Sequence, residues 1–344
     1  MERCSFRGGA GGRRPGAAGR RSAGAGRGGA PQRADAGDPA VPVRGAVIRK
    51  EPLGPDAERR ARREAVMLER LRGVAGVAQL ADAPRHPGSV LLADAGEVSL
   101  AEVPKPLSAG ELAWVAAGLG RSVAGMHARG VMHRDITPAN VVLSGGGVPC
   151  LVGFALALPV ADIRPAFVPY AEIAGTLAYL APESTGRTGR PVDQRADLYA
   201  LGAVLYELAT GAPPFGAGDP LRLIHDHLAR VPVPPAQMNP EIPAALSAVI
   251  LHLLEKEPDH RYQTADGVVY DLERLRDARG GPGAAVFQLG ERDVPLRLAP
   301  PSRLAGRDGE VAALREAFEQ ALAGRCRGGA GRRGAGGGQD SAGG

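Results

Sequence analysis

Residues 133–143 read HRDITPANVVL, and this segment constrains the fold of the chain more than any other. It places Asp135 five residues before Asn140 and ends in a short apolar run. An aspartate at this point can orient a hydroxyl group, and an asparagine five residues later can reach a metal ion on bound phosphates. The HRD triplet alone is a weak signal. Its weight comes from the asparagine in register and from further blocks in the same order.

Charge is distributed unevenly along the 344 residues, whose net charge is +5. Residues 1–40 carry eight arginines against three acidic residues, and residues 327–344 carry three arginines against one aspartate. The body, 41–326, is therefore near −2, and we expect no nucleic-acid partner. Both ends are rich in glycine and poor in large apolar residues, which predicts disorder. An RNA-binding arginine–glycine tail is the alternative, but no aromatic residues are interleaved for base stacking.

Membrane and disulfide signals are weak. No run of about 18 apolar residues occurs, so we expect no membrane partner. The three cysteines (Cys4, Cys150 and Cys326) are widely scattered, without metal-type spacing. This pattern fits a reduced, cytoplasmic protein.

Hydrophobic periodicity predicts an α+β protein with two lobes. Strands are expected at 46–50, 77–80 and 89–92, with a helix at 56–72, which together form a small, β-rich lobe at 41–96. The larger lobe, 97–278, is helical. Ser108 and Glu111 form a capping box that opens a helix ending near Arg129. Further helices are expected at 193–210, 219–229, 243–254 and 263–277, followed by a linker at 279–303.

Residues 46–278 resemble a eukaryotic-type (Hanks-type) serine/threonine protein kinase. By this resemblance Lys50 contacts the α/β-phosphates of ATP, Glu64 pairs with Lys50, Asp135 orients the hydroxyl of a protein substrate, and Asn140 holds magnesium. The remaining matches are structural: the tripeptide Ala181-Pro182-Glu183 ends the activation segment, Asp197 braces the catalytic loop, and Arg261 pairs with Glu183.

Some of these positions also have simpler interpretations. Lys50 is one of three lysines beside thirty-nine arginines, which suggests a need for a compact ammonium, although a surface lysine beside a strand is the alternative. Glu64 could be a solvated helix charge. His133 is expected to pack rather than act as a base. Thr176 is either a phosphorylation site or a structural hydroxyl near Asp135.

The departures from the family pattern limit the functional prediction. Gly153 stands where the family has the metal-binding aspartate of its D-F-G motif, and Thr137 stands where a lysine is usual. No glycine-rich phosphate loop is visible, and the region before residue 41 lacks the alternating apolar residues of the family's first two strands, so the resemblance implies an incomplete small lobe. Loss of the metal aspartate should reduce the rate on the order of 10³-fold. Two functions therefore remain open: an ATP- and magnesium-dependent protein serine/threonine kinase, or a pseudokinase with a regulatory or scaffolding role.

The C-terminal region resembles the beginning of another module. Residues 300–311 are similar to the L-x-G-R-x-x-E entry segment of the signalling ATPase module that follows such kinases in bacterial regulators. We assign 304–326 to the start of this module and 327–344 to a disordered tail. No lysine follows Lys256, so no phosphate-binding loop is present. We expect the chain to be a fragment with truncated or frame-shifted ends, and downstream ATPase or sensor modules to be its partners.

Overall fold

The computed structural model describes residues 47–51, 54, 56–82, 88–96, 98–162, 176–277, 288–294 and 316. The chain divides into two compact units, Met1–Val294 and Pro295–Gly344. Of the second unit only Glu316 is described, so the fold and the site below belong to the first unit.

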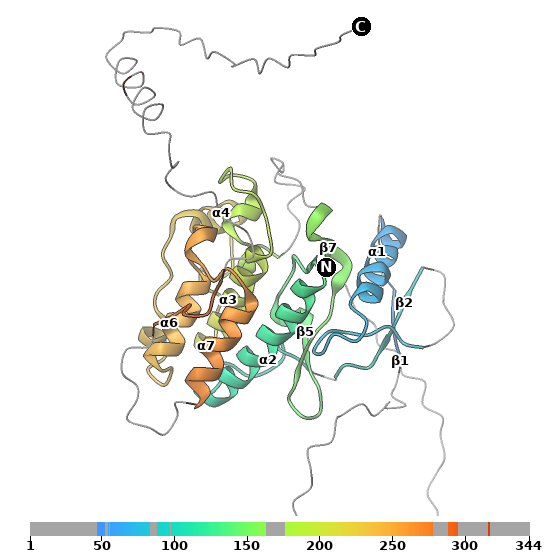
Figure 1. Ribbon diagram of the computed structural model, residues 1–344, viewed down its shortest axis with the longest axis horizontal. Coiled ribbons are helices and arrows are strands. Elements are labelled where there is room, and N and C mark those ends of the chain that lie inside the picture. Colours follow the sequence, from blue (N-terminus) through green and yellow to red (C-terminus); the bar gives the residue numbers. More distant parts are fainter. Residues whose placement is uncertain are drawn as a thin grey trace, which may run out of the picture. The chain divides into compact units, whose positions relative to one another are not determined.

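A two-stranded sheet and one helix form the N-terminal part of this unit (Figure 1). Strand β1 (Val47–Lys50) pairs antiparallel with β2 (Val90–Ala93), which places Lys50 opposite Val90. Helix α1 (Ala57–Arg70) buries four residues: Ala61, Glu64, Met67 and Leu68. Of these, only Glu64 is charged. A buried glutamate among apolar residues needs a partner, which the site provides.

The strand predicted at 77–80 is not continuous. Val77 forms a single parallel bridge with Leu151, while Leu80 forms a single antiparallel bridge with Leu92. The backbone therefore serves two different neighbours within four residues, and no regular ladder to either of them can develop.

The larger part of the unit is helical. The capping box of α2 (Ala109–Ala128) is formed as predicted, with the Ser108 hydroxyl accepting from the amide of Glu111. Helices α3 (Arg195–Thr210), α4 (Pro220–Ala229), α6 (Ala244–Leu253) and α7 (Ala265–Asp277) lie at the predicted places. The short helix α5 (Pro235–Met238) was not predicted, because four residues between prolines show no periodicity. Helix α2 packs against α7 and α3.

Short strands support the loop that carries the HRD segment. They form a three-stranded sheet of β3 (Val98–Ser99), β5 (Val141–Leu143) and β6 (Pro149–Leu151), and a pair of β4 (Val131–Met132) with β7 (Leu158–Pro159). The HRD loop runs between β4 and β5, so both of its ends are fixed by strand pairing.

Helix α3 is the centre of the core. Almost its entire length is buried, including the acidic residues Asp197 and Glu207. A helix that is enclosed on every side can present polar groups to several neighbours at once. The described part of the chain is thus mixed α and β, mostly helical with small sheets, and none of its helices is long and apolar enough to span a membrane.

Candidate active site

Asp197, near the start of α3, holds the HRD loop by accepting hydrogen bonds from its backbone. Its carboxylate accepts the backbone N–H groups of His133 (2.9 Å) and Arg134 (2.8 Å). Arg134 has a φ of 69°, a left-handed conformation that costs a non-glycine residue about 1 kcal/mol. The two hydrogen bonds to Asp197 offset this strain and fix the path of the loop.

The charge on Asp197 is stabilised within the core. Burial alone would raise the pKa of the Asp197 carboxyl, but a hydrogen bond from His127 Nε2 (2.9 Å) and the amide of Arg134 hold that pKa below its usual value. The carboxylate is therefore ionised when it accepts the loop amides, and charge-assisted hydrogen bonds of this kind are the stronger ones.

His133 packs inside the protein, as its sequence context predicted. Its ring is fully buried and lies edge-on to Phe154, with 4.6 Å between ring centroids. Burial lowers the pKa of His133, so the neutral ring is favoured. With Nε2 2.9 Å from the carbonyl of Val152 and Nδ1 3.3 Å from the amide of Asp135, we assign the proton to Nε2.

The Asp135 carboxylate is held by two neighbours. Oδ1 accepts from the backbone N–H and the hydroxyl of Thr176, both at 2.9 Å. Oδ2 accepts from Asn140 Nδ2 at 3.0 Å, and the same amide donates to the backbone carbonyl of Asp135 at 2.8 Å. The structure thus places Asp135 and Asn140 in direct contact, and it shows Thr176 in the structural position that was one of its two interpretations.

Lys50 and Glu64 also meet. Lys50 Nζ lies 3.0 Å from each carboxylate oxygen of Glu64, a residue that is only 2% exposed. Glu64 Oε1 accepts the backbone N–H of Phe154 at 3.1 Å as well. The glutamate therefore links the end of β1 to the residue that follows Gly153, and its charge is not that of a solvated helix face.

Gly153 lies between the two pairs. Its φ of 82° and ψ of 43° are left-handed, and a Cβ at this position would lie 2.3 Å from Oδ1 of Asn140. Contacts this short do not occur in proteins, so this arrangement of Asn140 requires a glycine on both counts. Glu64 and Asn140 therefore lie at the Gly153-Phe154 step. Each of them binds one further predicted site residue, Glu64 binding Lys50 and Asn140 binding Asp135.

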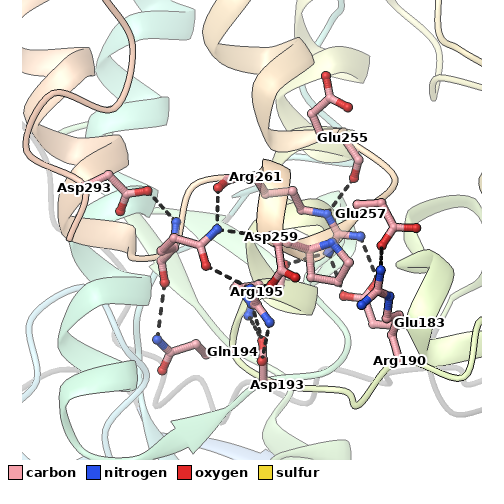
Figure 2. A network of polar contacts seen from close by, with 12 residues as sticks. Glu183, Arg190, Asp193, Gln194, Arg195, Glu255, Glu257, Asp259, Arg261 and Asp293 are labelled. Atoms are coloured by element: carbon pink, nitrogen blue, oxygen red, sulfur yellow. Dashed lines mark hydrogen bonds and ion pairs between the residues drawn. The ribbon is translucent and has the colours of Figure 1, made fainter. Parts of the chain in front are cut away.

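A recess opens beside Asp135. Its wall includes Thr176 and Tyr179, from the segment that ends in the buried ion pair between Glu183 and Arg261. Arg261 donates to both carboxylate oxygens, at 2.6 and 2.7 Å, and both side chains are inaccessible to solvent (Figure 2). This fork-to-fork geometry fixes the end of the segment to the helical core.

A second buried charge pair was not foreseen. Lys105 donates to Glu207 on α3 at 2.7 Å, and the same carboxylate accepts from the hydroxyl of Tyr179 in the recess wall. The signal for this pair in the sequence was the small number of lysines. The chain keeps three, and the structure shows that all three are at least partly buried. The third, Lys256, lies 4.5 Å from the ring centroid of Phe215, and burial lowers its pKa to about 8.

Among the described residues no cluster of three or more His, Cys, Asp or Glu side chains could hold a metal ion. A metal at this site would therefore need Asn140 together with oxygens supplied by a bound phosphate chain.

Comparisons with known proteins find similar sequences among bacterial serine/threonine kinases. Serine/threonine-protein kinase PknB of Mycolicibacterium smegmatis is 38% identical over 180 residues, which are 52% of this chain and 28% of that protein. PknB of Mycobacterium tuberculosis is 36% identical over 173 residues, 50% of this chain and 27% of that protein. The probable serine/threonine-protein kinase SCO3848 of Streptomyces coelicolor is 38% identical over 164 residues, 48% and 24% respectively. The chain spans less than a third of the length of these relatives.

The family comparison covers most of the chain. The profile described as "Protein kinase domain" matches residues 24–270, and so begins upstream of residue 41, where the sequence predicts the domain to start. With the HRD loop, the Lys50–Glu64 pair and the Glu183–Arg261 anchor all within this range, the chain belongs to the protein kinase domain family.

Proposed function

We propose that this chain is a protein serine/threonine kinase domain that transfers the γ-phosphate of ATP to a hydroxyl group of a protein substrate. The observation that carries the proposal is the Asp135 carboxylate, held by Thr176 and Asn140 in the wall of a recess. The relationship to bacterial serine/threonine kinases supports the same reaction.

In this mechanism Asp135 orients the substrate hydroxyl and takes up its proton. Oδ1 already accepts twice from Thr176, whereas Oδ2 accepts only from Asn140 and keeps a second lone pair for the incoming hydroxyl. The proton passes to the carboxylate as the new O–P bond forms and the bond to the ADP leaving group breaks. Lys50, held in place by Glu64, provides the positive charge for the α/β-phosphates.

Magnesium fits this site only in part. Asn140 Oδ1 is an oxygen ligand of the type that magnesium prefers, and its amide nitrogen is directed to Asp135. Gly153 supplies no carboxylate beside it. Asn140 would hold the ion, and the bound ion would neutralise phosphate charge. Without a carboxylate at position 153, the protein would supply fewer ligand oxygens to it.

A pseudokinase is the alternative, and Gly153 is the observation that favours it. A domain that keeps the Lys50–Glu64 pair but lacks a metal carboxylate can still bind nucleotide and act as a regulatory or scaffolding element. Binding without transfer separates this function from the first.

The test is transfer of labelled γ-phosphate from Mg-ATP to the chain itself and to a generic basic protein. Asp135→Asn is the blank, because it keeps the shape of the side chain and removes the proton acceptor. We expect transfer above the blank. Transfer equal to the blank, with ATP binding that is lost in Lys50→Met, would assign the chain to the pseudokinases.

Two further predictions from the sequence remain proposals. Residues 304–326, assigned to the start of an ATPase module, lie outside the described residues apart from Glu316. We propose that such a module, or a sensor module, is the regulatory partner of the kinase domain, in the cytoplasm. Titration of the chain with a separately expressed ATPase or sensor module, with γ-phosphate transfer as the readout, would test whether the two influence each other.

A further inference from the structure

Asp293 caps a helix that begins about thirty residues earlier in the chain. Its Oδ2 accepts the backbone N–H of Gln263 at 2.5 Å, and its Oδ1 accepts the N–H and the hydroxyl of Thr264 at 2.9 and 2.8 Å. Thr264 immediately precedes α7, and its hydroxyl accepts the N–H of Gly267 at 3.1 Å, so Asp293 holds the residue that caps the helix and satisfies its own N–H. A carboxylate there is also favoured by the helix dipole.

The rest of the segment 288–294, which we call the strap, also fits α7. Gly290 N–H donates to Asp271 at 2.7 Å, and Arg274 donates to Glu291 at 2.7 Å. A Cβ on Gly267 would lie 2.5 Å from Asp293 Oδ1, so the helix has a glycine where the strap carboxylate passes. Contacts along the length of α7 make the strap part of the domain. The first compact unit accordingly ends at Val294, inside the stretch where the sequence suggested a linker.

The capped residues belong to a larger polar network (Figure 2). The Gln263 side chain donates to the carbonyl of Arg261 at 2.7 Å and accepts from Arg195 Nη1 at 2.8 Å. Arg261 in turn holds Glu183 through two hydrogen bonds and also donates to the carbonyl of Arg195. A continuous set of hydrogen bonds therefore runs from Asp293 in the strap to Glu183, which anchors the segment beside Asp135.

We infer that the strap is a regulatory device that couples the chain continuing at Pro295 to the segment 176–186 beside Asp135. With Asp293 in place, Gln263 is fixed and orients Arg195 and Arg261 around Glu183. A force or a partner that draws the strap from α7 leaves the amides of Gln263 and Thr264 unpaired and loosens this anchor. The inference concerns the fold alone and does not depend on phosphoryl transfer.

Amide hydrogen exchange on the full chain tests the inference with Asp293→Ala and Asp293→Asn. We expect exchange at Gln263 and Thr264 to rise roughly tenfold in Asp293→Ala, the usual effect of losing a cap. At Ser184 and Gly186, whose amides bond to Ala181 and Glu183, we expect a rise of roughly threefold or more. The matched control, Asp277→Asn, changes an exposed aspartate on the same helix and should alter none of these rates.

Two outcomes would overturn the inference. Unchanged exchange at Gln263 and Thr264 would mean that Asp293 does not cap α7. A rise confined to those two amides, without change at Ser184 and Gly186, would reduce the strap to a local cap. Gln263→Ala tests the route, because Asp293→Ala should add nothing at Gly186 in that background. Unfolding of Asp293→Ala would be seen as uniformly fast exchange in α2 and α3. In that case the same amides are measured in Asp293→Asn, which retains one acceptor oxygen, and that result tests the inference.

Discussion

Replacing Gly153 by aspartate would restore the missing metal carboxylate, but the structure predicts a cost in stability. The new Cβ would lie 2.3 Å from Asn140 Oδ1 and 2.7 Å from its Cγ, so the Asn140 amide must turn away. Turning breaks its two hydrogen bonds to Asp135, each worth about 1 kcal/mol. The left-handed backbone at position 153 adds about 1 kcal/mol for a non-glycine residue.

We therefore expect Gly153→Asp to lower the free energy of unfolding by about 3 kcal/mol without nucleotide. Gly153→Ala is the matched control, because it introduces the same Cβ at the same φ without a carboxylate. Urea denaturation should give similar losses for both variants. Added Mg-ATP should stabilise the aspartate variant more than the alanine variant, since a ligand stabilises the state that binds it better.

The rate of γ-phosphate transfer then separates the effect of the carboxylate from that of the added Cβ. Under conditions where both variants are folded, Gly153→Asp should transfer γ-phosphate faster than Gly153→Ala, on the order of 10³-fold if the missing charge limits the rate. The reasoning fails if Gly153→Ala is as stable as the parent chain, because Asn140 would then not occupy the space beside Gly153. Equal transfer rates in the two folded variants would show that the absent carboxylate does not limit the reaction.

Three further perturbations test the site and its support. Lys50→Met removes the cation from the buried Glu64 carboxylate and should weaken ATP binding on the order of tenfold or more by equilibrium titration. Arg261→Met strands the Glu183 carboxylate in the core and should cost about 3–5 kcal/mol in urea denaturation. Burial, with some repulsion from a nearby lysine, lowers the pKa of His227 to about 4 from 6.5. The unfolded state therefore takes up the proton first, so this contribution to stability is complete above pH 6.5 and falls by about 2 kcal/mol by pH 5.

Each of these expectations has a contrary result. ATP affinity that is unchanged in Lys50→Met would remove Lys50 from the nucleotide site. If Arg261→Met and Glu183→Gln together are no more stable than Arg261→Met alone, the stranded charge is not the source of the cost. For His227, the replacement His227→Gln should lose less stability than the parent chain between pH 7 and pH 5, and equal losses would assign the acid sensitivity to other groups.

The sequence predicted the components that short motifs specify. The HRD loop, the capping box of α2 and the four long helices from α3 to α7 depend on local spacing, and the structure places them where expected. The contact between Lys50 and Glu64 was suggested only by resemblance, because fourteen residues separate the two along the chain. The geometry of this contact depends on how α1 packs beside β1, and no local sequence pattern predicts that packing.

Other features depend on distant contacts and could not be predicted. The discontinuous pairing at Val77 and Leu80 arises because two neighbours compete for one short backbone segment. The strap resembled a linker because its glycine- and proline-rich surroundings suggest flexibility, whereas its order comes from one carboxylate, Asp293, that meets a helix start far back in the chain. The overlap between Asn140 and a side chain at position 153 can likewise be recognised only in the folded structure.

The distribution of lysines has a practical consequence for chemical labelling. The chain has three, and each ammonium is engaged: Lys50 with Glu64, Lys105 with Glu207, and Lys256 against Phe215. An amine-reactive ester should therefore modify Lys50 and Lys105 slowly in the folded protein, whereas the lowered pKa of Lys256 leaves more of its amine in the neutral, reactive form. Mass spectrometry of acylated peptides would then report nucleotide occupancy at Lys50 and opening of the recess wall at Lys105, with almost no background from surface amines.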